Sequence, residues 1–164
     1  MPAPTHWLAP FATRILSALD IGRPRPASAL LAHGYAYLPI PNVDGHALYL
    51  RLAAQCVMTP WPVDAPTVVL TIAGTVALEV YQEPKDMQAG RPQYARSFGA
   101  EQVFAVHPGT LCATQSSIDG LQVLATSRAL VAADELAGDE YAAAARRACW
   151  VLESLPPTTV VGRC

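Results

Sequence analysis

The stretch from Val68 to Tyr81 alternates apolar and polar side chains, and this alternation restricts the fold more than any other feature of the chain. The apolar side chains of one parity are Val68, Leu70, Ile72, Val76, Leu78 and Val80. A period of two is typical of β-strands with one buried face. Ala73-Gly74 lies in the middle of the stretch, where a turn would divide it into two strands.

Several further segments have the length and composition of short strands. Three leucines at positions 48, 50 and 52 alternate with Tyr49, Arg51 and Ala53. The other candidates are 35–38, which ends at Pro39-Ile40-Pro41, and 102–106, 111–115 and 121–126, which are separated by turn residues. Residues 83–93 are expected to form a polar loop. Short strands at this spacing predict an antiparallel sandwich or barrel rather than alternating strands and helices.

Helical patterns occur at both ends of the chain. Residues 7–19 place their apolar side chains near one face, and Asp139 is a candidate cap for a helix within 134–155. The 164 residues are enough for one well-packed core. We therefore expect a mainly β single domain over 1–164: an N-terminal helical segment at 1–34, a barrel or jelly roll at 35–127, and a C-terminal helix at 134–155.

The composition excludes several classes of partner. The net charge of -2 gives no electrostatic signature of nucleic-acid binding. No apolar run approaches the roughly 18 residues of a membrane span, and no signal-peptide pattern is visible at the start. We expect a cytoplasmic protein that binds neither nucleic acid nor membrane. Its thiols are then expected to be reduced: Cys56, Cys112, Cys149 and Cys164.

The region of about 45–127 resembles the cupin superfamily, whose two motifs read G-x5-H-x-H-x(3,4)-E-x6-G and G-x5-P-x-G-x2-H-x3-N. In cupins these motifs bring three histidines and one glutamate around a divalent metal. Gly74 takes the place of the last glycine of the first motif, which puts Thr67 at the glutamate. The histidine pair falls at Trp61 and Val63, or at Pro60 and Pro62 with the longer spacer.

The second motif is matched equally incompletely. Gly109 takes the place of its glycine, His107 stands at the proline position with Pro108 beside it, and Cys112 replaces the histidine. Ser116 stands where the motif has asparagine. Of the four ligand positions, only Cys112 carries a good metal ligand, and one thiolate does not hold a mononuclear catalytic metal. The resemblance therefore implies a degenerate cupin with no metal and no cofactor.

Individual residues leave alternatives open. Cys112 is either a nucleophile, activated by His107 or His46, or a small hydrophobe that fills the vacated ligand space. Trp61 either lines a ligand cavity or plugs the barrel. Arg51 points into the barrel and receives an acidic ligand if the three leucines face the helices, and is otherwise solvated. The aromatic side chains expected to pack in the wall are Tyr35, Tyr37 and Tyr49.

From these residues we expect a metal-independent, cupin-like protein that binds a small, largely apolar molecule in the barrel, as a binding or regulatory module. The expected ligand-binding residues are Trp61, Thr67, Arg51 and Cys112. One alternative is a metal-free isomerase or cyclase that transfers a proton through Cys112, His107 or His46. A second is a metalloenzyme whose ligands have moved to His33, His46, His107 and Cys112. A homodimer is expected to form through 35–38 and the apolar stripe of 141–152.

Overall fold

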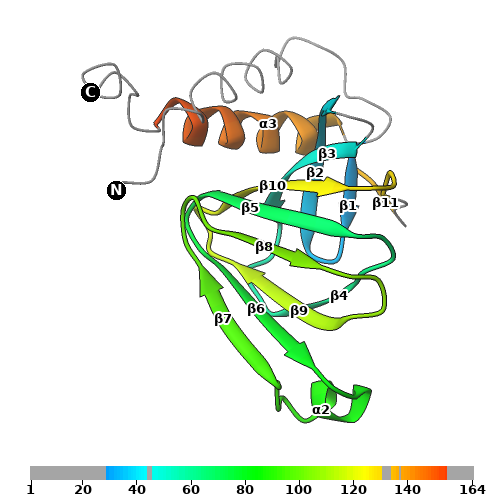
Figure 1. Ribbon diagram of the computed structural model, residues 1–164. Coiled ribbons are helices and arrows are strands. Elements are labelled where there is room, and N and C mark those ends of the chain that lie inside the picture. The colour runs from blue at the N-terminus through cyan, green and yellow to red at the C-terminus, as the bar shows by residue number, and fades with distance from the viewer. Residues whose placement is uncertain (1–28, 44–45, 131–133, 137, 155–164) are drawn as a thin grey trace, which may run out of the picture.

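The computed structural model describes residues 29–43, 46–130, 134–136 and 138–154, and they form two antiparallel sheets and a long C-terminal helix (Figure 1). In spatial order, the larger sheet contains β11 (Asp134–Glu135), β1 (Leu30–Ala32), β2 (Tyr35–Val43), β3 (His46–Ala53), β10 (Leu121–Thr126), β5 (Thr67–Ala73) and β8 (Val103–Val106). The smaller sheet contains β4 (Thr59–Pro62), β9 (Leu111–Ser116), β6 (Val76–Tyr81) and β7 (Tyr94–Phe98).

The strands from β3 to β10 have the nested pairing of a jelly roll. The first pairs with the last, β3 with β10, and inside this pair β4 pairs with β9, β5 with β8, and β6 with β7. This gives two four-stranded groups, β3-β10-β5-β8 and β4-β9-β6-β7. A double-sheet jelly roll is the architecture of cupins, so the predicted fold class is confirmed. Among the described strands, no hydrogen-bonded pair joins the two sheets, so the barrel is not closed.

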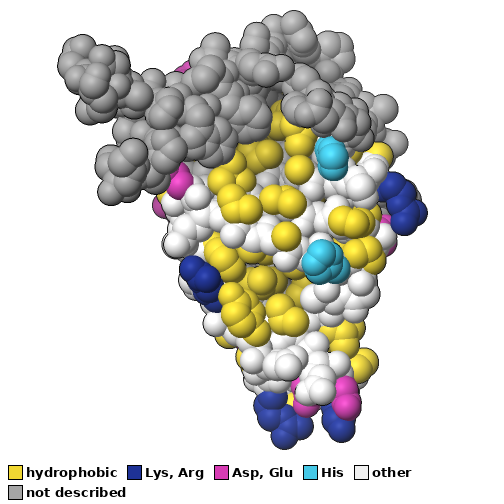
Figure 2. Space-filling view, in the orientation of Figure 1, with side chains coloured by type: hydrophobic (Ala, Val, Ile, Leu, Met, Phe, Trp, Pro, Cys, Tyr) yellow, Lys and Arg dark blue, Asp and Glu magenta, His cyan; other side chains and the backbone are white. Residues whose placement is uncertain are grey.

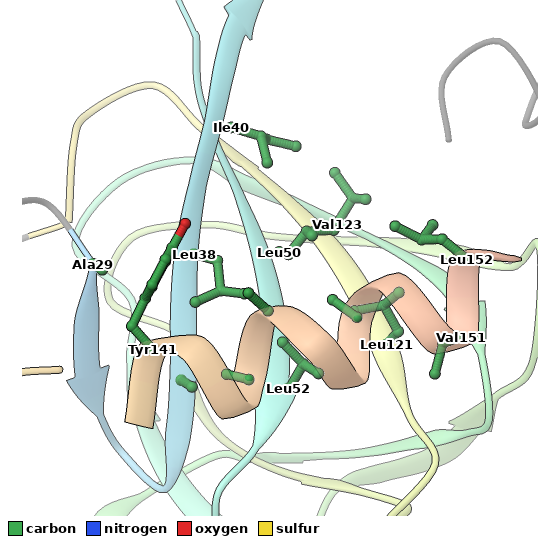
Figure 3. Packing of buried hydrophobic residues seen from close by; sticks show 14 of the residues in the cluster. Ala29, Leu38, Ile40, Leu50, Leu52, Leu121, Val123, Tyr141, Val151 and Leu152 are labelled. Carbon is green, nitrogen blue, oxygen red and sulfur yellow. The ribbon is translucent and has the colours of Figure 1, made fainter. Parts of the chain in front are cut away.

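The alternation in β3 divides its side chains between two apolar layers. Leu48, Leu50 and Leu52 belong to a cluster on the outer face of the larger sheet, beneath helix α3 (Gly138–Glu153). Figure 3 shows this helix lying across the sheet, with Leu50 and Leu52 of β3 beside it. Tyr49 and Ala53 belong to the second cluster, between the two sheets. Because the leucines face the helix, Arg51 points to the interior, and the solvated alternative for Arg51 is wrong.

Helix α3 docks on the sheet through small side chains. Ala144, Ala145 and Ala148 are buried between larger residues, which lets the helix backbone lie close to the strands. The helix begins later than the predicted 134–155, because Asp134 and Glu135 pair with β1 as strand β11. Asp139 lies in the first turn, where the helix dipole favours a negative charge.

Proline positions explain two more differences from the predicted strands. β2 continues to Val43, through Pro39 and Pro41, where the prolines predict either the end of the strand or an edge position. β1 pairs only with Tyr35–Tyr37, so on that side the later part of β2 has no partner strand among those described, and missing N–H donors are tolerated. The unpredicted β4, which contains Pro60 and Pro62, likewise lies at a sheet edge.

The loop predicted at 83–93 contains the short helix α2 (Pro84–Gln88), and the strand that follows it, β7, was not predicted. The turn between β5 and β6 lies where Ala73-Gly74 predicted it. The helix predicted at 7–19 lies outside the described residues. In the part of the chain that is described, no helix is long and apolar enough to cross a membrane.

Candidate functional site

A row of polar side chains crosses the interior face of the larger sheet. The strand register places Tyr37 opposite Arg51, Arg51 opposite Gln122, and Gln122 opposite Thr71. All four are buried, with Arg51, Gln122 and Thr71 each 0% exposed. Polar groups are costly to bury unless they are hydrogen-bonded, so such a row between two apolar layers is a candidate site.

Arg51 is at the centre of this row and is held on three sides. Its Nε donates a hydrogen bond to Gln122 Oε1 at 3.0 Å. The guanidinium carbon lies 4.1 Å from the ring centroid of Tyr35 and 5.1 Å from that of Trp61, which are cation–π distances. The terminal nitrogens Nη1 and Nη2 are buried, and neither has a hydrogen-bond partner among the described residues. Arg51 is therefore fixed in place with its two terminal amino groups outside hydrogen-bond geometry, and the Tyr37 hydroxyl is a polar neighbour that interacts with the guanidinium.

The groups around Arg51 are themselves held by hydrogen bonds. Gln122 Nε2 donates to Ser116 Oγ at 3.0 Å, and Ser116 Oγ donates to the carbonyl oxygen of Ser117 at 3.0 Å. The Tyr35 and Thr114 hydroxyls lie 3.0 Å apart and link the two sheets. This second layer limits how far the guanidinium and its ring neighbour can move.

Cys112 lies on the opposite sheet, directly across from Trp61 in the β4–β9 register. Its thiol donates a hydrogen bond to the Trp61 carbonyl oxygen at 3.6 Å. Burial raises the pKa of the Cys112 thiol from 9.0 to about 11, against the opposing effect of the Arg51 charge. Burial also raises the pKa of the Tyr37 phenol, again opposed by Arg51. At neutral pH both groups are uncharged, so neither neutralises the guanidinium.

A cavity of about 120 Å³ opens between β1 and β4, and Arg51 itself does not line it. Its buried wall contains Tyr37 and Trp61, which both neighbour the guanidinium, and its exposed rim contains His33 and Asp64. The remaining lining residues are apolar: Leu30, Ala32, Pro62 and Leu130. Trp61 thus lines a cavity, one of the two alternatives that the sequence left open.

The other predicted site residues lie elsewhere. His46, Thr67 and His107 line a separate groove of about 510 Å³ on the face of β5 and β8. Hydrophobic side chains gather over these strands, with histidine beside them (Figure 2). Thr67 Oγ1 donates to the Ala65 carbonyl oxygen at 2.9 Å. The structure thus brings Arg51, Trp61 and Cys112 together, and separates them from Thr67 and both histidines.

This separation bears on two of the earlier alternatives. The charge that acts on the Cys112 thiol is that of Arg51, and the exposed imidazoles of His46 and His107 are in the outer groove. Within the described ranges, no three His, Cys, Asp or Glu side chains are close enough together to hold a metal ion. The set His33, His46, His107 and Cys112 is therefore not assembled at one place.

Two glycines of the cupin resemblance stand where the backbone requires glycine. Gly74 has φ +69°, and a Cβ there would lie 2.5 Å from Ser117 Oγ and 2.7 Å from the Gly120 Cα. Gly109 has φ +82° in the turn between β8 and β9. Residues with a side chain rarely adopt such positive φ values, so turn geometry explains why glycine stands at both matched positions.

Gln122 is not among the site residues predicted from the sequence. The one feature that could have indicated it is a long polar side chain in the otherwise apolar run 121–124. This run follows the turn that ends at Gly120. Tyr35 was expected to pack in the wall, and the structure adds its ring contact with Arg51.

No family model and no curated protein matches the sequence. Among solved structures, a protein of unknown function from Vibrio parahaemolyticus is similar at 14% identity, covering 61% of this chain and 94% of that chain, with a TM-score of 0.45. KdgF from Halomonas sp. is similar at 13% identity, covering 58% of this chain and 82% of that chain, with a TM-score of 0.44. Hydroxypropylphosphonic acid epoxidase from S. wedmorenis is similar at 7% identity, covering 57% of this chain and 50% of that chain, with a TM-score of 0.45. Likeness of this size carries no argument about activity, and the jelly-roll assignment rests on the strand pairing.

Proposed function

We propose that this chain binds a small, largely apolar molecule between the two sheets of its jelly roll, without a metal ion, as a binding or regulatory module. The observation that supports this most is the cavity of about 120 Å³ with Tyr37 and Trp61 in its wall. Ligand sites are typically concave and apolar, with a few fixed polar groups. An apolar cavity of about 150 Å³ accepts benzene, so a single-ring molecule is the expected size class.

Metal independence is supported by the residues at the cupin ligand positions. Trp61 and Thr67 supply no imidazole and no carboxylate there, and the Cys112 thiol has a pKa of about 11. Elemental analysis of the purified full chain tests this part of the proposal. A stoichiometric transition metal would contradict it.

Binding is favoured over proton-transfer catalysis by the same groups. A general acid or base works best with a pKa near the operating pH. In the interior site, burial moves the pKa of Cys112 and of Tyr37 further above neutrality. We therefore propose a ligand-binding role for this interior, and a cytoplasmic location and a homodimer remain predictions.

The surfaces expected to form that homodimer are covered within the chain. Tyr35–Tyr37 pairs with β1 on one side and β3 on the other, and the buried stripe of α3 packs on the larger sheet. Leu38, the last residue of the predicted surface at 35–38, has no partner from β1, and the homodimer stays a prediction.

The test fills the cavity and, as a control, the outer groove. Ala32 lines the cavity and Ala105 lines the groove, so Ala32→Phe and Ala105→Phe are matched substitutions. Binding of benzyl alcohol, followed by calorimetry and ligand-observed NMR, is expected to weaken at least about tenfold in Ala32→Phe and to change little in Ala105→Phe. The reverse pattern would place the site in the outer groove and refute the proposal.

A further inference from the structure

We infer that Arg51 binds the carboxylate of the ligand, so that the molecule taken up is a small apolar carboxylate. This inference rests on the proposed function and specifies its ligand. It starts from Nη1 and Nη2 of Arg51, which are buried and have no hydrogen-bond partner among the described residues. A guanidinium presents these donors in a planar fork that matches the two oxygens of a carboxylate.

The surroundings of Arg51 favour an anion and are suited to hold it. Gln122 holds Nε and the Tyr35 ring lies 4.1 Å from the guanidinium carbon, so these two contacts keep the guanidinium in place even when Trp61 moves aside. Two ionisable groups near it, Cys112 and Tyr37, are neutral at neutral pH because burial raises the pKa of each, and the carboxylate of Asp64 lies at the exposed rim of the cavity. The positive charge of Arg51 is therefore left for the ligand to balance.

The charge and size of the site favour a monocarboxylate over a phosphate. In the described interior row, Arg51 is the one cation among Tyr37, Gln122 and Thr71. A phosphate dianion would keep an uncompensated charge in this apolar layer, whereas one carboxylate balances one guanidinium. The apolar part of the ligand would lie in the cavity of about 120 Å³, which is smaller than the cavity of about 150 Å³ that accepts benzene, so one small ring is the upper limit of size.

Trp61 is the side chain that would move to admit the carboxylate. It lines the cavity and lies over the guanidinium, so it separates the two. It is carried by β4, a strand of four residues with Pro60 and Pro62 on either side of Trp61. Among the described strands, β4 lies at a sheet edge and pairs only with β9. Edge strands with few partners open more readily than central strands. We therefore place the entry to Arg51 at β4.

The experiment compares sodium benzoate with benzyl alcohol on the full-length chain at neutral pH. Wild type is expected to bind benzoate at least about tenfold more tightly than benzyl alcohol, because only benzoate pairs with the fork. This preference is expected to persist in about 0.5 M NaCl, since a buried ion pair is poorly screened. The Arg51→Met variant is expected to bind the two compounds with similar affinity, because the planar fork that distinguishes them is gone.

The matched control is Arg96→Met. Arg96 is exposed and also lies over an aromatic ring, that of Phe98 at 4.9 Å, so its removal takes away a similar contact without touching the interior. It is expected to keep the preference for benzoate. Arg51→Lys keeps the charge but loses the planar fork, and an intermediate affinity for benzoate is expected.

The outcomes separate the two proposals. If wild type binds benzyl alcohol as tightly as benzoate, or loses its preference in salt, the carboxylate inference fails and the proposed function stands. If neither compound binds, both fail. The wild-type comparison decides the inference even where a variant does not fold.

Discussion

Replacing Arg51 and Gln122 together by methionine is expected to make the ligand-free protein more stable. Moving a guanidinium into the interior costs several kcal/mol. The hydrogen bond to Gln122, at 3.0 Å, returns about 1.5–3 kcal/mol, and the rings of Tyr35 and Trp61 return about 1–2 kcal/mol each. These contributions roughly cancel the desolvation of the charge. The unpaired Nη1 and Nη2 then make the net contribution of Arg51 to the stability of the ligand-free fold unfavourable, since each unpaired buried donor costs about 1–3 kcal/mol.

The double substitution removes those donors without leaving a new unpaired group. Methionine is similar in length to both residues and packs well against aromatic rings. Ser116 Oγ keeps its hydrogen bond to the Ser117 carbonyl oxygen after Gln122 is lost. We expect the free energy of unfolding to rise by about 1–4 kcal/mol, as when other buried charged groups are replaced by apolar ones. Arg51→Met alone leaves Gln122 Oε1 unpaired, so its free energy of unfolding is expected to rise by less than that of the double variant.

The assay is equilibrium urea unfolding followed by circular dichroism, without added ligand. Arg147→Met is the control, because Arg147 donates to the carbonyl oxygens of Ala53 at 3.2 Å and Ile118 at 2.9 Å, and its loss is expected to destabilise by about 1–2 kcal/mol. A loss of about 3 kcal/mol or more in the double variant would show that Arg51 stabilises the empty fold. Such a loss would contradict the prediction that the buried guanidinium destabilises the ligand-free protein.

Three further predictions concern the thiols, the turn and the helix contact. Because burial raises the pKa of Cys112 to about 11, the folded state favours the neutral thiol, so stability falls as pH rises from about 9 to 11, by up to about 2 kcal/mol. Between pH 7.5 and 10, the free energy of unfolding measured in urea should fall less in Cys112→Ala than in wild type. Thiol labelling of the native protein at pH 8 should modify the exposed Cys56 well before the buried Cys112, and equal labelling rates would contradict the burial of Cys112. Gly74→Ala is expected to destabilise by more than about 1 kcal/mol, since φ is +69° and the added Cβ meets backbone and side-chain atoms; an unchanged urea midpoint would argue against it. Leu50→Ala is expected to lower the free energy of unfolding by about 2–5 kcal/mol by opening a cavity under α3, and Val103→Ala, at an exposed position, by far less.

Much of the β framework could be predicted because its strands show local signals. The alternation of Leu48, Leu50 and Leu52 and the turn at Gly74 need only neighbouring residues to be recognised. The edge strands gave weaker signals. β4 carries two prolines in four residues, and β7 has exposed side chains at four of its five positions, so neither shows a clear apolar parity.

The candidate site was predictable only in part, because its geometry depends on pairing between distant strands. Local alternation limited Arg51 to two alternatives, and the contact between the leucines and α3 decided between them. Gln122 reaches Arg51 from a strand 71 residues away, and no local pattern reports such a contact. The same limit explains why Thr67 was grouped with Trp61, although the structure puts them at different places.

The nested pairing of β3 with β10 also has a consequence for the order of assembly during synthesis and folding. The hydrogen bond from Arg51 to Gln122 spans 71 residues, and the link between Tyr35 and Thr114 spans 79. Chains dominated by contacts of such long range fold slowly, because distant segments must meet before their contacts contribute. A chain that has not yet placed β10 would hold a charged side chain without its only described hydrogen-bond acceptor. The guanidinium is therefore in position only once the last strand of the jelly roll is added.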